Sequence, residues 1–148
     1  MTTHCQRVAV PGGRGMLGSD LCAALSAAGH TPVSVDLPEF DITRQEHLEE
    51  VLSGVDAVVN CAAYTQVDRA ESEAGLAAAV NHHAVAALGA LAAARGLYVI
   101  HIGTDFVFDG RLDRPYRESD PPAPLSVYGA TKLAGEEALR ASGCRHAV

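Results

Sequence analysis

The chain of 148 residues is long enough for one domain with a hydrophobic core, and its 48% hydrophobic and 20% charged residues are typical of a globular protein. Its formal net charge of −7 argues against nucleic acid or an anionic membrane as the main partner. Residues 1–4 show no signal peptide and the four cysteines form no C-x-x-C pair, so we expect no disulfide, no metal site and a cytoplasmic location.

The first predicted unit is a strand, a glycine turn and a helix. An apolar run at residues 8–10 predicts a buried strand, and a helical pattern follows as far as Ala28. Between them, Gly12 would allow a tight turn, Gly15 would let the backbone approach a phosphate, and Gly18 would let the helix pack closely. This arrangement favours a pyrophosphate at the helix N-terminus, although a glycine triplet also occurs in ordinary strand–helix turns.

A second strand is predicted over residues 32–36, and it ends in a carboxylate. Asp36 lies about 20 residues beyond the glycine turn, where a dinucleotide-binding unit places the acid that binds the adenosine ribose. The alternative is an aspartate that only caps a turn. Arg14 could instead hold a 2′-phosphate, so NADH and NADPH both stay open.

A third unit follows with the same order of elements. Thr43, or else Asp41, is the expected N-cap of a helix, with Glu46 completing a capping box. Residues 56–60 then predict a third buried strand, and the small residues at 61–65 suit either a flat, extended ligand or a short packed loop. Alternating strands and helices predict an α/β fold: a Rossmann-type, doubly wound parallel sheet with helices on both faces.

The middle of the chain is expected to hold two helices and a strand. Residues 67–78 predict a polar-faced helix, and residues 79–94 predict an alanine-rich helix that is buried rather than membrane-spanning. The adjacent His82 and His83 face different directions, which makes a metal chelate unfavourable. Residues 97–102 predict the next strand.

The last part of the chain is predicted to be a long loop, a helix and a strand. Residues 109–124 are rich in proline and charge, which is typical of a functional loop. Ser126 is the expected N-cap of a helix that runs to Ala141, and residues 145–148 predict the start of a strand.

Tyr128 and Lys132 form the pair that points to chemistry. They are four residues apart, so one face of the last helix carries both a phenol and an ammonium. A neighbouring cation favours the phenolate form, which would make Tyr128 a proton donor to a carbonyl under reduction. Thr104, at the end of the fourth strand, would polarise the same carbonyl. Such a pair also occurs by chance on surface helices.

Together these features resemble the extended short-chain dehydrogenase/reductases and, within them, the dTDP-4-dehydrorhamnose reductase family. The glycine turn, the strand-end threonine and Y-x-x-x-K carry the wider resemblance. The segments that match the narrower family span nearly the whole chain and are residues 41–43, 59–71, 104–110, 115–118 and 128–136.

The resemblance implies hydride transfer from NADPH or NADH to the C4 keto group of a nucleotide-linked deoxysugar, of the dTDP-4-dehydrorhamnose to dTDP-rhamnose type. Thr104, Tyr128 and Lys132 would be catalytic, while Phe106 and Val107 would approach the sugar. The residues that would bind the cofactor are Gly12, Gly15, Met16, Leu17, Asp36, Asp41, Ile42, Ala62, Ala63, Tyr64, Thr104, Tyr128 and Lys132. A homodimer is compatible with the resemblance.

Two departures from the family pattern affect the substrate side. The family usually has serine and tyrosine where this chain has Gly103 and Phe106, which could loosen substrate positioning. The family chain also continues beyond the position of Val148 into a sugar-binding region. We therefore expect residues 1–148 to be one NAD(P)-binding Rossmann domain without that region.

Three other functions remain open at this point. A dehydratase or epimerase of the same superfamily is disfavoured, because dehydration typically needs an Asp-Glu pair and Asp105 precedes Phe106. A non-catalytic, NADP-binding regulatory subunit like that of methionine adenosyltransferase resembles the same reductases. The third alternative is a nucleotide-binding module that is inert without the sugar-binding region.

Overall fold

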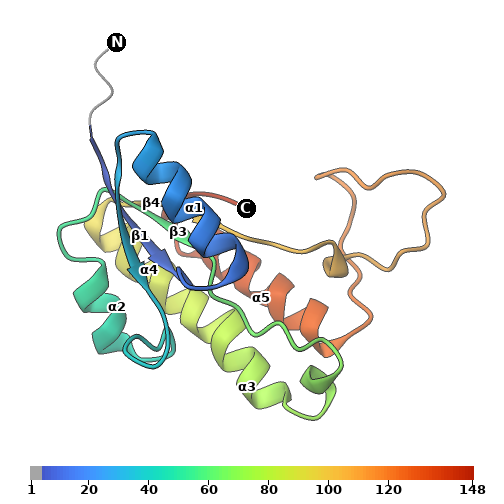
Figure 1. Ribbon diagram of the computed structural model, residues 1–148. Coiled ribbons are helices and arrows are strands. Elements are labelled where there is room, and N and C mark those ends of the chain that lie inside the picture. Colours follow the sequence, from blue (N-terminus) through green and yellow to red (C-terminus); the bar gives the residue numbers. More distant parts are fainter. Residues whose placement is uncertain (1–4) are drawn as a thin grey trace.

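The computed structural model describes residues 5–148, so the expectation about residues 1–4 lies outside the described part. One parallel sheet forms the centre of the fold, with strand order β2-β1-β3-β4-β5 (Figure 1). The strands are β1 (Arg7–Pro11), β2 (Thr31–Val35), β3 (Ala57–Asn60), β4 (Tyr98–His101) and β5 (Arg145–Ala147). This order confirms the predicted α/β, Rossmann-type architecture, in which the switch in strand order lies between β1 and β3.

The helices cover the two faces of the sheet unequally. They are α1 (Met16–Ala27), α2 (Gln45–Val51), α3 (Ala74–Ala78), α4 (Ala84–Arg95) and α5 (Val127–Ala141). On one face, α1 packs its Leu21 and Leu25 against Val8, Val10 and Val59. The other helices lie across the opposite face, while the chain between β4 and α5 extends to one side of the sheet (Figure 1).

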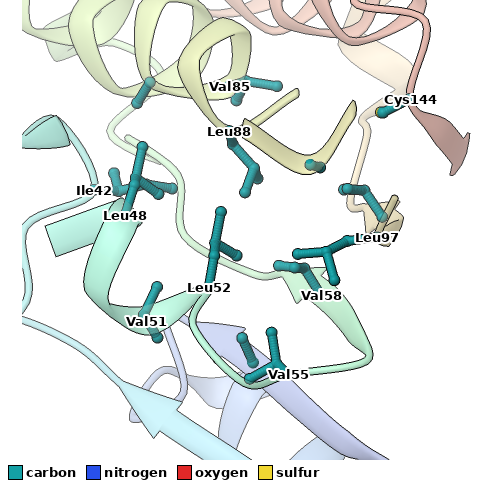
Figure 2. Close-up of a cluster of buried hydrophobic side chains, with 14 of the residues drawn as sticks. Ile42, Leu48, Val51, Leu52, Val55, Val58, Val85, Leu88, Leu97 and Cys144 are labelled. Atoms are coloured by element: carbon teal, nitrogen blue, oxygen red, sulfur yellow. The ribbon is translucent and has the colours of Figure 1, made fainter. Parts of the chain in front are cut away.

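The main core lies between the sheet and helices α2, α4 and α5. Figure 2 shows Leu88 of α4 and Leu52, just after α2, pointing toward each other over Val58 of β3. Burying a leucine or valine side chain contributes about 1.5–3 kcal/mol each, so this cluster holds the helices against the sheet. The sheet in turn fixes where the carboxyl ends of its strands lie.

The helix expected over residues 67–78 is wrong for residues 67–73 and confirmed only from Ala74. The structure has a short 3-10 turn, η1 (Arg69–Glu71), and α3 begins only at Ala74. Glu73 leaves the helical conformation, with φ −116° and ψ 35°, and its carboxylate accepts hydrogen bonds from Tyr64 and Arg69. The helical pattern is thus broken immediately before Ala74.

From Ala74 to Arg95 the chain is one continuous helix, in which α3 and α4 are joined by a π-helical turn, η2 (Ala79–His83). By length and composition alone, this helix could cross a membrane. In the structure its buried residues pack against the sheet and α5, as core helices do.

The capping box expected before α2 is also wrong. The N-cap of α2 is Arg44, which makes no side-chain capping bond. The Thr43 hydroxyl instead donates to Asp41 Oδ1 over 2.7 Å, and that carboxylate oxygen also accepts the Thr43 N–H. The competing local turn thus takes the threonine that would have capped the helix. The Ser126 cap of α5 is confirmed, since Ser126 Oγ accepts the N–H of Gly129 over 3.0 Å.

Candidate functional site

A cavity of about 610 Å³ lies at the carboxyl ends of β1, β3 and β4. Ligands of open α/β sheets bind at this edge, next to the switch in strand order. Of the residues predicted to bind a cofactor, all except Thr104 line the cavity. It is also lined by Gly18, Leu37, Phe40, Cys61, Thr65, Leu76, Val80, Ile102 and Gly103.

The glycine turn forms one wall, and its shape depends on missing side chains. Gly12 has φ +76°, and a Cβ there would stand 2.6 Å from the backbone nitrogen of Ala62. A Cβ on Gly18 would stand 2.2 Å from the carbonyl oxygen of Gly12. The start of α1 is therefore packed directly on the turn, and its free N–H groups lie beside the cavity. Met16, at the first position of α1, is 91% exposed and leaves this end of the helix accessible.

Asp36 follows β2 and holds the glycine turn in place. Its Oδ2 accepts the N–H of Arg14 over 3.0 Å, and its Oδ1 accepts the N–H of Leu37 over 2.8 Å. The Arg14 side chain is exposed and paired with Glu39. Arg14 and Glu39 line a neighbouring cavity of about 390 Å³ between β2 and α2, which shares Asp36 with the main cavity.

Asp41 lines the cavity at the same end. Hydrogen bonds from Thr43 hold the pKa of its carboxyl below the ordinary value, so Asp41 is ionised at neutral pH. Its backbone N–H donates to His47 Nδ1 over 2.8 Å. Asp41 therefore combines a fixed negative charge with an anchored backbone.

The segment Ala62–Tyr64 after β3 forms a second wall, and Asn81 anchors it. The Asn81 side chain accepts the N–H of Tyr64 over 2.9 Å and donates to the Tyr64 carbonyl over 3.1 Å. Asn81 is 1% exposed and lies in the π-helical turn of an apolar helix. The Tyr64 hydroxyl donates to Glu73 over 2.6 Å, and this bond raises the pKa of Tyr64. Sequence reasoning missed Asn81, whose one signal is an amide within an alanine-rich run.

Tyr128 and Lys132 of α5 close the cavity from the side of β4. They are 9% and 2% exposed. The ammonium of Lys132 donates to the carbonyl of Ile102 over 2.6 Å, and burial lowers the pKa of Lys132 while nearby Glu136 opposes that shift. The structure thus places the predicted phenol and ammonium on one face of one helix and in one cavity.

The three residues predicted to act on the substrate, Thr104, Phe106 and Val107, do not line the main cavity. Thr104 caps a 3-10 turn, η3 (Asp105–Val107), because its Oγ1 accepts the N–H of Phe106 over 3.3 Å. Phe106 is 47% exposed, meets the Tyr128 ring edge-on at 5.5 Å between centroids, and lines a separate cavity of about 390 Å³. Val107 is buried and lines none of these cavities.

Gly103 sits where the family usually has serine. A Cβ there would stand 2.8 Å from Glu136 Oε1. Burial raises the pKa of the Glu136 carboxyl, which occupies the space that a serine side chain would take. Within residues 5–148, no group of three or more His, Cys, Asp or Glu side chains could hold a metal ion.

Comparisons with known proteins identify the family and the relatives that this chain is similar to. The family described as "RmlD substrate binding domain" matches residues 6–148. A dTDP-4-dehydrorhamnose reductase of Mycolicibacterium smegmatis is 42% identical over 139 residues, which are 93% of this chain and 42% of that protein. A probable low-salt glycan biosynthesis reductase, Agl14 of Haloferax volcanii, is 43% identical over 88% of this chain and 48% of its own length. The chain thus spans about half the length of the curated relatives it matches.

Solved structures give the same result for the fold. The dTDP-4-dehydrorhamnose reductase of Bacillus anthracis in complex with NADP has a TM-score of 0.92 and 30% identity, and the match covers 99% of this chain and 53% of that one. The enzyme of the same name from Clostridium acetobutylicum has a TM-score of 0.90 and 32% identity, with coverages of 95% and 51%. The fold and family expected from the sequence are therefore confirmed.

Proposed function

Because the chain belongs to the RmlD substrate binding domain family, we propose that it binds NADPH or NADH and reduces the C4 keto group of a nucleotide-linked deoxysugar, of the dTDP-4-dehydrorhamnose to dTDP-rhamnose type. The observation that carries the proposal is the single cavity that joins the glycine turn to Tyr128 and Lys132. The named relatives are reductases, which supports this function over that of a regulatory subunit.

The residues present fit a dinucleotide. Gly12 and Gly18 let the start of α1 pack directly on the glycine turn, and Gly15, which would let the backbone approach a pyrophosphate, lines the cavity. The first turn of α1 offers N–H groups to its phosphates, and the Asp36 carboxylate lies where the adenosine ribose would bind. Ala62 and Ala63 present small side chains to a flat ligand. When bound, the reduced nicotinamide supplies the hydride.

The chain's own residues supply the proton and the orientation. As the carbonyl carbon accepts the hydride, the Tyr128 hydroxyl gives its proton to the carbonyl oxygen, so a ketone becomes an alcohol and the phenolate recovers a proton from solvent. The buried Lys132 ammonium stabilises that phenolate and is itself held by Ile102. Thr104 would donate a hydrogen bond to the same oxygen in place of the long bond, 3.4 Å, that its hydroxyl donates to Asp105, and it can keep accepting the Phe106 N–H.

Phe106 and Val107 are proposed to approach the sugar, with Phe106 as the accessible member of the pair. A homodimer, a cytoplasmic location and the assignment of residues 1–148 as one NAD(P)-binding domain are further parts of the proposal. The remaining sugar contacts are expected from a region like the one that the longer relatives possess.

The proposal is tested by following absorbance at the reduced-nicotinamide band with NADPH and dTDP-4-keto-6-deoxy-L-mannose. We expect oxidation by the wild-type chain and a loss of at least about 100-fold in Tyr128→Phe, which removes the proton donor. NADPH should bind both proteins equally in calorimetry. Oxidation that survives in Tyr128→Phe would contradict the role of Tyr128 as the proton donor. Binding without any turnover in the wild type would instead favour a regulatory subunit or a module that is inert without a sugar-binding region.

A further inference from the structure

His101 is a buried polar residue that the proposed reaction does not use. It ends β4, is 1% exposed, and its Nδ1 lies 3.1 Å from the Nδ2 of Asn60, which ends β3 and is 0% exposed. Within residues 5–148, His101 Nε2 is the one buried side-chain polar atom without a hydrogen-bond partner. A buried polar group that is retained despite an unmade hydrogen bond calls for an explanation in function.

The hydrogen bonds around Asn60 determine the form of His101. Asn60 Oδ1 accepts the backbone N–H of Ala62 over 3.1 Å, so the amide nitrogen of Asn60 must be the atom that faces His101. That nitrogen can only donate, and therefore His101 Nδ1 accepts and its proton sits on Nε2. The neutral ring is favoured further by burial and by the nearby Lys132 ammonium, which lower the pKa of His101 to about 4.

These bonds run from His101 to the wall of the cavity. Through Asn60, the imidazole fixes the N–H of Ala62, and the backbone of Ala62 is what Gly12 packs against. The residue after His101 supplies the carbonyl that holds the Lys132 ammonium. One strand end thus supports the glycine turn on one side and the proposed catalytic lysine on the other.

We propose that His101 is a positioning residue of this site, which acts through Asn60 to hold the segment Ala62–Tyr64 against the glycine turn in the geometry that binds the cofactor. His101 touches neither cofactor nor substrate in this assignment, since it does not line the cavity. The effect on cofactor affinity rests on the proposed function, whereas the effect on the segment does not.

Three variants distinguish a positioning role of His101 from a general effect on the stability of the fold. His101→Leu fills the space but removes the acceptor and leaves the Asn60 amide unpaired. His101→Asn can place an acceptor oxygen near the position of Nδ1. Val99→Ala is the matched control, because Val99 is 0% exposed on the same face of β4 and makes only apolar contacts in the main core.

The first readout is amide hydrogen exchange in the ligand-free chain, taken as the ratio of the rate at Ala62 to the rate at Val58 in β3. We expect His101→Leu to raise this ratio about tenfold or more, His101→Asn to restore most of the protection, and Val99→Ala to leave the ratio unchanged. A global loss of stability raises both exchange rates, so its effect cancels in their ratio. An unchanged ratio in His101→Leu, or an equal rise in Val99→Ala, overturns the proposal.

The second readout is the dissociation constant for NADPH from calorimetry. His101→Leu should weaken binding about tenfold, and His101→Asn and Val99→Ala should stay close to the wild type. Wild-type binding in His101→Leu would also overturn the positioning role. A wild-type chain that binds no NADPH would instead contradict the proposed function, and the exchange ratio would still decide whether His101 holds the segment.

Discussion

The cavity floor and the neighbouring segment of residues 109–124 are held by opposite kinds of interaction. Beneath the cavity, Asn60, Asn81, His101 and Lys132 are almost fully buried, and their hydrogen bonds join different strands and helices. The segment has no strand or helix, and the ion pair between the exposed Arg114 and the half-buried Asp120 is among the contacts that hold it. Buried polar networks fix one arrangement of the side chains, whereas ion pairs near the surface contribute little to the stability of the fold. The floor of the proposed cofactor cavity is thus fixed by buried contacts, whereas the segment of residues 109–124 is held by contacts closer to the surface.

The largest expected effect comes from filling the glycine turn. Gly12→Val would place a branched side chain at φ +76° and within 3 Å of the Ala62 backbone, so we expect NADPH affinity to fall at least about 100-fold. Gly54→Ala is the control, because Gly54 also has a positive φ, of +68°, but nothing lies within 4 Å of its Cβ position. It should lower stability while leaving the dissociation constant unchanged. Equal affinities of Gly12→Val and wild type for NADPH would show that the glycine turn is not rigid.

A smaller effect, on stability, is expected when low pH protonates His101 in the buried network. The pKa of His101 is about 4 in the folded chain and near 6.5 when unfolded, so between these values the unfolded chain binds the extra proton. Stability should therefore fall as the pH drops from 6.5 toward 4, with a contribution from His101 of about 2 kcal/mol at pH 4.5.

Urea unfolding at pH 7 and pH 4.5 measures this difference. His101→Asn should lose about 2 kcal/mol less than the wild type between the two pH values, because it removes the group that titrates. Val99→Ala, a change in the same strand, should keep the wild-type pH dependence. Parallel losses in His101→Asn and wild type would mean that the imidazole is not held neutral.

A third effect concerns the exposed charges of the neighbouring cavity between β2 and α2, which shares Asp36 with the main cavity. Arg14 is paired with Glu39 beside Asp36. If the Arg14 guanidinium binds the 2′-phosphate, Arg14→Gln should weaken the binding of NADPH about tenfold and change the binding of NADH little. Glu39→Gln, which frees Arg14, should shift the preference toward NADPH. Calorimetry with both cofactors gives the ratio, and an equal change for NADH in Arg14→Gln would assign Arg14 a purely structural role.

The smallest effect is expected in the segment of residues 109–124. Arg114→Gln removes the two-bond ion pair with the half-buried Asp120, and we expect a small drop in the unfolding midpoint and no measurable change in NADPH affinity. Hydrogen exchange near residue 117 should nevertheless rise, because Asp120 also accepts the N–H of Arg117. A clear drop in NADPH affinity would mean that this segment and the cavity floor are coupled.

The difference between local and long-range contacts explains which features the sequence could predict. The strands, α1, α5 and the Ser126 cap follow from local patterns, and the cavity residues near Gly12 and Tyr128 follow from motifs placed on those elements. The bond from Asn60 to His101 joins residues 41 apart in the chain, and neither residue belongs to a local pattern. The helix expected over residues 67–78 begins only at Ala74, and the bond between Tyr64 and Glu73 just before it also joins residues that no local pattern relates.

The most direct test of the central claim is calorimetric titration of the 148-residue chain with NADPH and with NADH, in wild type and in Tyr128→Phe. The cavity between the glycine turn and Lys132 predicts binding at one site, with a similar dissociation constant in both proteins, because Tyr128→Phe removes one hydroxyl and leaves the rest of the cavity lining in place. Absence of heat with both cofactors, in a chain whose circular dichroism shows the folded α/β structure, would contradict the assignment of this cavity to a dinucleotide.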